Sequence, residues 1–262
     1  MATALHSGPG DPVPGELART YDLVAHSVPV AGRTFRLLAV RDTNRLVDGI
    51  DPKTFAADER LPYWAELWTA SIALAEWCLG TRWEPAARVL ELGCGLGLAG
   101  IAAAAAGAHV TMTDYDDDAL RFARCNAGAN LPPDVVRDHL RFAHLDWRNP
   151  PLDTTYDVIL GADIVYERRF FLPLLTLFDR LLNPSHSRSS TGPLRSVGRD
   201  MCPDLGRQGG CVVLTEPDRS VGKEFFHGAK LAGFDVTTQN SVVYWQGRAA
   251  GIVRAELRRG GR

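Results

Sequence analysis

A short stretch in the first half of the chain, residues 89–97, constrains the fold more than any other part of the sequence. It reads Val-Leu-Glu-Leu-Gly-Cys-Gly-Leu-Gly, so an apolar strand breaks into closely spaced glycines, and an alanine-rich helix follows over 98–106. Glycines let the backbone turn sharply and approach a ligand, and the start of a helix offers unpaired N–H groups to polar or anionic atoms. A second strand over 109–113 ends in Asp114, whose carboxylate can accept both hydroxyls of a ribose. This pattern predicts a site for a cofactor that contains a nucleoside.

The glycines alone do not identify that cofactor. A Gly-x-Gly-x-x-Gly pattern starting at Gly95 also satisfies the dinucleotide fingerprint, and a helix–strand turn in an unrelated α/β protein is a further alternative. However, Glu91 lies two residues before Gly93, and the glycine series begins directly at the strand end. This register resembles motif I of the seven-strand S-adenosylmethionine (SAM) methyltransferases. The resemblance implies SAM as the cofactor and Asp114 as the residue that binds its ribose.

Strands and helices alternate through the rest of the chain, which predicts a parallel sheet with helices on both faces. The expected strands are 88–92, 109–113, 140–145, 157–162 and 211–215, and the expected helices lie at 68–80 and near 97–106, 117–128, 169–182 and 221–232.

The two ends of the chain add β structure to this alternation. Residues 21–30 and 34–40 are predicted to form a hairpin around a turn at 31–32. The last two β segments, 234–240 and 251–257, have no helix between them and should pair antiparallel. The predicted fold is therefore α/β: a Rossmann-like seven-strand sheet, mostly parallel, with an antiparallel C-terminal strand and an N-terminal β-hairpin.

Residues 17–262 are interpreted as a single domain, preceded by a tail over 1–16 that is rich in Gly and Pro and predicted to be disordered. One stretch does not fit the domain. Between Leu182 and Cys211 lie 28 residues without periodicity, where such a connection normally has about 2–6. Removing 185–208 would leave an ordinary Asn-Pro-Gly-Gly turn. We interpret 185–208 as an inserted surface loop, with a substrate lid as the alternative.

Composition excludes several classes of partner. The formal net charge of −2 provides no basic footprint for nucleic acid or an anionic membrane surface. No apolar run approaches the roughly 20 residues that span a bilayer. The five cysteines form no Cys-x-x-Cys pair and have no metal-like spacing with histidine. We therefore expect reduced thiols in a cytoplasmic protein, without a metal site.

Three further segments belong with the glycine motif. The segment 61–68 reads Leu-Pro-Tyr-Trp-Ala-Glu-Leu-Trp, 145–147 ends the third core strand, and 161–166 ends the fourth. The last two lie where open α/β sheets bind ligands. Together they resemble the family 16 protein-lysine methyltransferases, whose Asp-x-x-Tyr signature is here Asp163-Ile-Val-Tyr166. The resemblance runs from about 62 to 171 and, more loosely, over 212–226. The sequence of 62–68 is similar to that of bacterial-type members.

The resemblance implies a role for each residue of the site. The glycine motif would contact the methionine part of SAM, Asp114 would hold the ribose, and Asp146 with Trp147 would bound the adenine. Asp163 and Tyr166 would be the catalytic pair that faces the substrate. The full set implied to bind the cofactor is Trp68, Glu91, Gly93, Cys94, Gly95, Gly97, Asp114, Asp146, Trp147 and Ala162.

The implied function is transfer of a methyl group from SAM to a lysine side chain of a protein. A free lysine is neutral in only about one molecule in a few thousand at pH 7. A sulfonium ~4 Å away costs an ammonium about 4 kcal/mol at an effective dielectric near 20, which lowers its pKa by ~3. Because a carboxylate would raise that pKa again, Asp163 is expected to capture and orient the amine rather than to act as the base.

Other functions stay open at this stage. The same pocket could serve a small-molecule N- or O-methyltransferase, for example one acting on a nicotinamide-like amine. A nicotinamide-dependent oxidoreductase shares the glycine loop, but no Tyr in this chain is followed four residues later by Lys. A SAM-binding module without catalysis is the third alternative.

Overall fold

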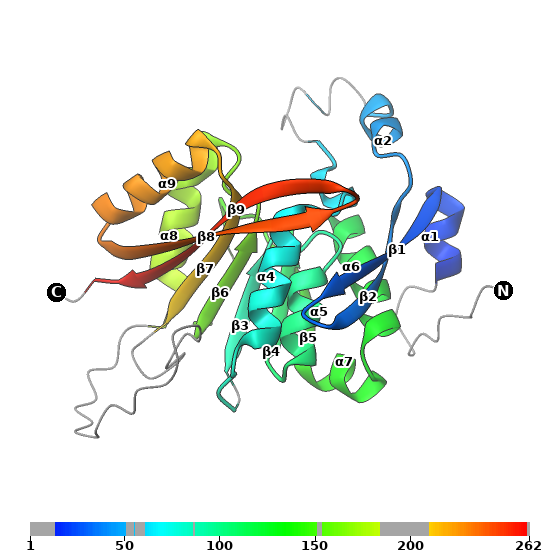
Figure 1. Ribbon diagram of the computed structural model, residues 1–262, viewed down its shortest axis with the longest axis horizontal. Coiled ribbons are helices and arrows are strands. Elements are labelled where there is room, and N and C mark those ends of the chain that lie inside the picture. Colours follow the sequence, from blue (N-terminus) through cyan, green and yellow to red (C-terminus); the bar gives the residue numbers. More distant parts are fainter. Residues whose placement is uncertain are drawn as a thin grey trace.

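The computed structural model describes residues 14–50, 55, 61–85, 87–150, 154–183 and 210–260. Its centre is a seven-stranded sheet of order β5-β4-β3-β6-β7-β9-β8 (Figure 1). The first five strands in this order run parallel to one another, as the alternating pattern predicted. They are β3 (Arg88–Leu92), β4 (His109–Asp114), β5 (Leu140–His144), β6 (Val158–Ala162) and β7 (Cys211–Pro217).

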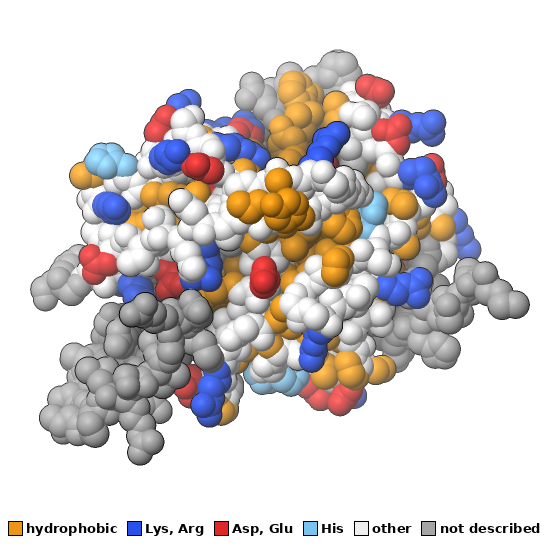
Figure 2. All heavy atoms as spheres, viewed as in Figure 1, with side chains coloured by type: hydrophobic (Ala, Val, Ile, Leu, Met, Phe, Trp, Pro, Cys, Tyr) orange, Lys and Arg blue, Asp and Glu red, His pale blue; other side chains and the backbone are white. Residues whose placement is uncertain are grey.

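The sheet ends in an antiparallel hairpin formed by β8 (Phe234–Trp245) and β9 (Arg248–Arg259). Strand β9 lies between β7 and β8 and pairs antiparallel with both, so the predicted seven-strand architecture is confirmed. Both strands are longer than predicted because the hairpin continues past the sheet and reaches over α4 towards the N-terminal hairpin (Figure 1). At its tip, the ring of Trp245 lies 5.9 Å from that of His26. Apolar side chains gather over this hairpin in Figure 2, and Val242 and Tyr244 are exposed.

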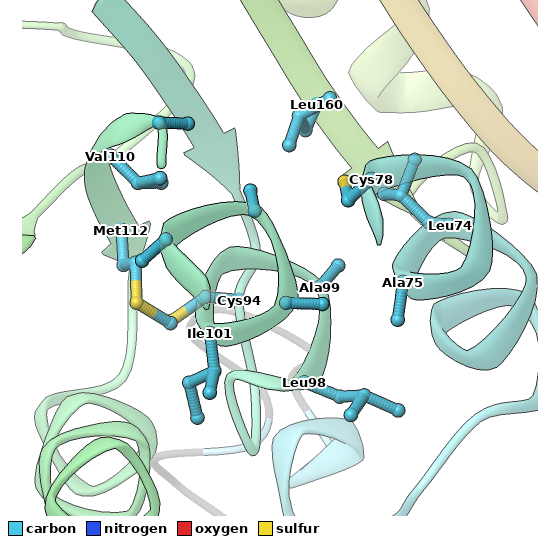
Figure 3. Close-up of a cluster of buried hydrophobic side chains, with 14 of the residues drawn as sticks. Leu74, Ala75, Cys78, Cys94, Leu98, Ala99, Ile101, Val110, Met112 and Leu160 are labelled. Carbon is cyan, nitrogen blue, oxygen red and sulfur yellow. The ribbon is translucent and has the colours of Figure 1, made fainter. Parts of the chain in front are cut away.

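Helices cover both faces of the sheet, also as predicted. Side chains of β3 alternate between the faces: Val89 packs in the core beneath α4, α5 and α6, whereas Leu90 packs in the core beneath α8 and α9. Figure 3 shows part of the first core, where side chains from helices and strands meet, among them Leu74, Ile101 and Met112. The helices are α4 (Thr69–Gly80), α5 (Leu98–Ala105), α6 (Asp117–Asn130), α7 (Pro133–His139), α8 (Phe171–Leu181) and α9 (Ser220–Leu231).

The N-terminal hairpin, β1 (Leu23–Val30) and β2 (Arg33–Val40), turns through Ala31 and Gly32 at positive φ, 48° and 79°. It packs on α6 through Asn126, whose amide accepts from the Leu38 N–H at 2.7 Å and donates to the Leu38 carbonyl at 3.1 Å. The same amide donates to the Leu96 carbonyl at 3.0 Å. One buried side chain therefore connects the predicted hairpin to the glycine loop.

The segment before the hairpin differs from the prediction. Helix α1 (Pro14–Thr20) begins inside the tail that was expected to be disordered to residue 16, whereas residues 1–13 lie outside the described part of the chain. Leu17 of α1 is fully buried in a cluster with Phe122. This tertiary contact stabilises a turn whose Gly- and Pro-rich surroundings predict none. A second short helix, α2 (Asn44–Asp48), was also not predicted.

Across the described ranges, no helix is both long and apolar enough to cross a membrane.

The predicted insertion, 185–208, lies outside the described residues, but both of its flanks are described. Helix α8 ends at Leu181, and the Gly210 N–H donates to the Asn183 carbonyl at 3.1 Å. If 185–208 were removed, Asn183 and Gly210 would become the first and last residues of a four-residue turn. This hydrogen bond is the one that closes such a turn, and Pro followed by Gly suits its two central positions.

We therefore expect a chain lacking 185–208 to fold with a melting temperature within about 5 °C of the full chain, since the hydrogen bond between the flanks is kept. Calorimetric unfolding of both chains measures this difference. A control deletion of 183–210 removes the turn itself and should destabilise the protein much more. Insolubility of the 185–208 deletion would contradict the interpretation of this segment as an insertion.

Candidate active site

A cavity of about 420 Å³ opens at the carboxyl ends of the parallel strands, within the range typical of small-molecule sites. Its wall is formed by the loops after β3, β4, β5 and β6 and by the segment 61–71. The structure brings together on this wall all the residues that the sequence assigned to the site. They are Trp68, Glu91, Gly93, Cys94, Gly95, Gly97, Asp114, Asp146, Trp147, Ala162, Asp163 and Tyr166.

The glycine loop after β3 packs closely against neighbouring segments of the cavity wall. Gly93 and Gly95 have φ of 61° and 50°, a conformation that disfavours side chains. A methyl group on Gly93 would lie 3.2 Å from Ile164 and 3.3 Å from Trp147. One on Gly95 would lie 3.3 Å from the Trp64 carbonyl oxygen. The loop therefore presents bare backbone to the cavity.

Gly97 lines the same cavity but has a second reason to be glycine. A methyl group there would lie 2.9 Å from the Met112 side chain and 3.0 Å from that of Ala123. These atoms belong to β4 and α6, against which the first turn of α5 packs. Gly97 thus allows α5 to approach its neighbours closely.

Asp114 ends β4 directly below this loop and is 9% exposed. Its Oδ2 accepts a hydrogen bond from the Gly95 N–H at 2.9 Å, and its Oδ1 accepts one from the Asp116 N–H at 3.0 Å. Burial raises the pKa of Asp114 to about 6, against the effect of these N–H groups. A carboxylate has about four acceptor positions, so Asp114 can still accept hydroxyl donors from the cavity.

Glu91 lies deeper, on β3, and is 3% exposed. Its Oε2 has no hydrogen-bond partner among the described residues, and a methyl group on Gly100 would lie only 2.3 Å from this oxygen. Burial raises the pKa of Glu91 to about 8. Glu91 is therefore mostly protonated at pH 7, whereas an exposed glutamate would be charged.

The far end of the cavity lies after β5, at the residues that the sequence assigned to adenine. The carboxylate of Asp146 accepts from the Arg148 side chain at 2.9 and 2.8 Å and from the Arg148 backbone N–H at 2.9 Å. Trp147 packs edge-on against Phe170 with the ring centroids 5.4 Å apart. These contacts hold Asp146 and Trp147 in fixed positions, with a flat aromatic surface on the cavity wall.

The opposite end contains Asp163, which follows β6 in the left-handed conformation with φ of 54°. Its backbone N–H donates to the Thr215 carbonyl at 2.8 Å. Its side chain is 5% exposed: Oδ2 accepts from Arg219 Nη2 at 3.0 Å, whereas Oδ1 has no partner among the described residues. Burial raises the pKa of Asp163, and Arg219 lowers it. Asp163, which lines the cavity, therefore has one buried carboxylate oxygen that can accept a further hydrogen bond.

Two residues of this end, Glu216 and Arg219, were missed by sequence analysis. Glu216 is 2% exposed, and its Oε1 accepts from the backbone N–H groups of Ile164 and Val165 at 3.0 and 3.2 Å. Burial, assisted by the negative charge of Asp163, raises the pKa of Glu216 well above its usual range. The available signal was its position at the end of β7, on the same sheet edge as Asp163.

Aromatic rings line the cavity near the Asp163 loop. The ring centroid of Tyr63 lies 5.4 Å from that of Tyr166 and 6.0 Å from that of Trp68. The Trp68 indole N–H donates to the Tyr63 carbonyl at 2.8 Å, and Tyr166 also packs against Phe170. Sequence analysis singled out Trp68 and Tyr166 but missed Tyr63. These rings form an apolar collar near Asp163.

Comparisons with known proteins agree on one family. The profile of a family described as lysine methyltransferase matches residues 58–191, just over half of the chain. Protein N-lysine methyltransferase METTL21A of Xenopus tropicalis is 45% identical over 91 residues, which cover 34% of this chain and 41% of the relative. Histone-arginine methyltransferase METTL23 of Homo sapiens is 30% identical over 136 residues, which cover 50% of this chain and 71% of the relative.

The fold agrees with these similarities. The crystal structure of Pyrococcus horikoshii TYW2 in complex with MeSAdo superposes with a TM-score of 0.50 at 17% identity, covering 90% of this chain and 70% of that chain. The chain spans about half the length of the METTL21A proteins that it matches. The family profile and the seven-strand sheet together show that this chain belongs to the lysine methyltransferase family.

Proposed function

We propose that this protein is a SAM-dependent N-methyltransferase that methylates a lysine side chain of a protein substrate. The observation that carries the proposal is the buried carboxylate of Asp163, which lies on the same cavity wall as the glycine loop and Asp114. A carboxylate in a largely apolar site suits a cationic substrate group rather than a neutral hydroxyl. The family of the chain and the activity for which the METTL21A relatives are named support the same substrate class.

The cavity fits SAM at three places. The bare backbone of the glycine loop can approach the methionine part, and Asp114 can accept the ribose hydroxyls while the Gly95 N–H fixes its position. Trp147 and Asp146 can bound the adenine by stacking and hydrogen bonding. When bound, SAM supplies an electrophilic methyl group on a positively charged sulfur.

The residues of the chain position the other reactant. Asp163 Oδ1 accepts a hydrogen bond from the incoming nitrogen and sets its direction of approach. Tyr63, Trp68 and Tyr166 surround the alkyl chain, exclude water and stabilise a cation through their ring faces. This proposal gives Asp163 and Tyr166 the substrate-facing roles that the Asp-x-x-Tyr signature implies.

The finer parts of the assignment stay predictions. The prediction that this chain is a bacterial-type member of the family rests on the sequence of 62–68, whereas the relatives named above are vertebrate proteins. A cytoplasmic location and the expectation of no nucleic-acid, membrane or metal partner rest on charge and cysteine spacing. METTL23 supports arginine as a second candidate substrate group, because Asp163 can pair with either cation.

The test is to incubate the protein with methyl-labelled SAM and a cell lysate and to hydrolyse the labelled proteins to amino acids. We expect the label in methyl-lysine, and far less of it when Asp163→Asn replaces the wild type. Label in methyl-arginine would change the substrate residue, and label confined to small molecules would support the small-molecule alternative. SAM binding without any transfer would indicate a non-catalytic module.

SAM affinity should depend on pH through Asp114. The pKa of Asp114 in the free protein is about 6, and ribose hydroxyls that donate to the charged carboxylate lower it in the complex. SAM binding is therefore strongest above pH 7, where Asp114 is already charged. Below pH 6, Asp114 must first lose its proton, which weakens the apparent affinity. If the pKa in the complex is 4 or lower, the dissociation constant at pH 5 should be about tenfold higher than at pH 7.5. Calorimetry from pH 5 to 8 measures this, and Asp114→Asn should not show the added dependence.

A further inference from the structure

The contact between Asp163 and Arg219 bears on the protonation of the substrate. Within the described residues, Arg219 provides the positive charge that contacts Asp163, through Nη2 and Oδ2 at 3.0 Å. The Asp163 side chain is 5% exposed, whereas that of Arg219 is 43% exposed. The guanidinium thus reaches the carboxylate from the solvent side and leaves Oδ1 as the acceptor without a partner.

A carboxylate beside a lysine creates a conflict in the proposed reaction. It attracts the ammonium, but it also stabilises the protonated form, which cannot attack a methyl group. A positive charge on the other carboxylate oxygen eases this conflict, because it offsets part of the field of Asp163 at the amine. The carboxylate can then orient the nitrogen through a hydrogen bond while holding its proton less strongly.

This inference rests on the proposed function: we propose that Arg219 is a positioning residue that partly neutralises Asp163, so that the carboxylate orients the substrate amine and the amine still loses its proton more readily.

The other charged groups near this end are already engaged or point to other partners. Glu216 from β7 binds the backbone N–H groups that follow Asp163. In the described ranges, four other titratable residues line this part of the cavity. Tyr63 comes from the segment 61–71 and Tyr166 from the loop after β6, and the side chains of Glu167 and Arg169 form an ion pair. Arg219 is therefore the group whose charge can be changed with the most direct effect on Asp163.

The size of the effect follows from distance and exposure. A guanidinium and an amine that share one carboxylate lie roughly 6 Å apart, which corresponds to about two pKa units at an effective dielectric near 20. Because Arg219 is partly exposed, solvent screening reduces this to about one unit. Removing the charge should raise the pKa of both the substrate amine and Asp163 by about that amount.

Three variants of the full chain separate charge from structure. Arg219→Gln removes the charge and keeps a hydrogen-bond donor, whereas Arg219→Lys keeps the charge. Lys223→Gln is the matched control, because it removes the same unit charge from the exposed pair with Asp218, one turn into α9 and outside the cavity.

The first measurement is the initial rate of label transfer from SAM to lysate protein between pH 6.5 and 9.5. In Arg219→Gln, the midpoint of the pH–rate profile should move about one pH unit higher with a similar plateau. Arg219→Lys and Lys223→Gln should keep the wild-type midpoint. A uniform loss of rate without a shift would assign Arg219 a merely structural role, and a higher rate at every pH would show that Arg219 competes with the substrate. Either result overturns the proposal.

The second measurement does not depend on the substrate. Carboxyl-carbon NMR of the protein saturated with S-adenosylhomocysteine follows the titration of Asp163 directly. The Asp163 midpoint should move up by about one pH unit in Arg219→Gln and stay in place in both other variants. An unchanged midpoint would contradict the proposal. If the wild type transfers no label at all, the proposed function fails, while this titration still decides whether Arg219 controls Asp163.

Discussion

Asp163→Asn should lower the rate of methyl transfer by about 10²-fold or more, while the affinity for SAM stays within roughly threefold. The substitution keeps the size of the side chain and one acceptor oxygen but removes the charge that we propose captures the amine. Asparagine also adopts the left-handed conformation more readily than most residues, so the φ of 54° at this position can be kept. The loss should therefore appear in transfer rather than in folding.

This result is measured by single-turnover transfer to the labelled substrate protein, alongside calorimetric titration with SAM. Asp179→Asn provides the control, since it removes a carboxylate from the exposed pair with Arg259, outside the cavity. Near-normal turnover of Asp163→Asn would rule out the amine-capturing role. An equal loss in SAM affinity would move Asp163 from the substrate to the cofactor.

Asp114→Ala should weaken SAM binding about tenfold to a hundredfold. The substitution removes a charge-assisted acceptor for the ribose, worth ~1.5–3 kcal/mol. It also leaves the Gly95 and Asp116 N–H groups without the carboxylate that they contact at 2.9 and 3.0 Å. Because Gly95 belongs to the loop that faces the cavity, part of the loss comes from a less ordered loop.

Calorimetry with SAM and with NADH measures this prediction. The control is Asp117→Ala, which removes an exposed acid at the start of α6 that does not line the cavity. A wild type that binds NADH but not SAM would overturn the cofactor assignment. Unchanged SAM affinity in Asp114→Ala would show that the ribose lies elsewhere.

Much of the fold could be predicted because its signals are local. The glycine loop needs backbone conformations that few residues adopt, and the alternation of strands and helices follows from hydrophobic periodicity. The order of the sheet then places Asp114 and Asp163 on one edge without further information. Helix α1 was not predicted because its stability comes from burying Leu17 against a segment about one hundred residues away.

The parts of the site that were missed depend on contacts between distant segments. Glu216 looks like an ordinary acid after a strand until its carboxylate is seen to bind the backbone of Ile164 and Val165. Arg219 lies in a loop whose sequence carries no recognisable motif, and only the folded chain brings it to Asp163. The position of Tyr63 depends on the same long-range packing. Sequence identifies the residues that need an unusual backbone, whereas their partners are set by tertiary structure.

The hydrogen bond between Asn183 and Gly210 has a consequence for how such a protein can evolve. Because a backbone hydrogen bond closes this turn, a segment inserted into the turn need not change the sheet. The entropic cost of lengthening a connection grows only with the logarithm of its length. New segments can therefore be acquired and lost at this position without disturbing the cavity at the other end of the strands, and related proteins can diverge here.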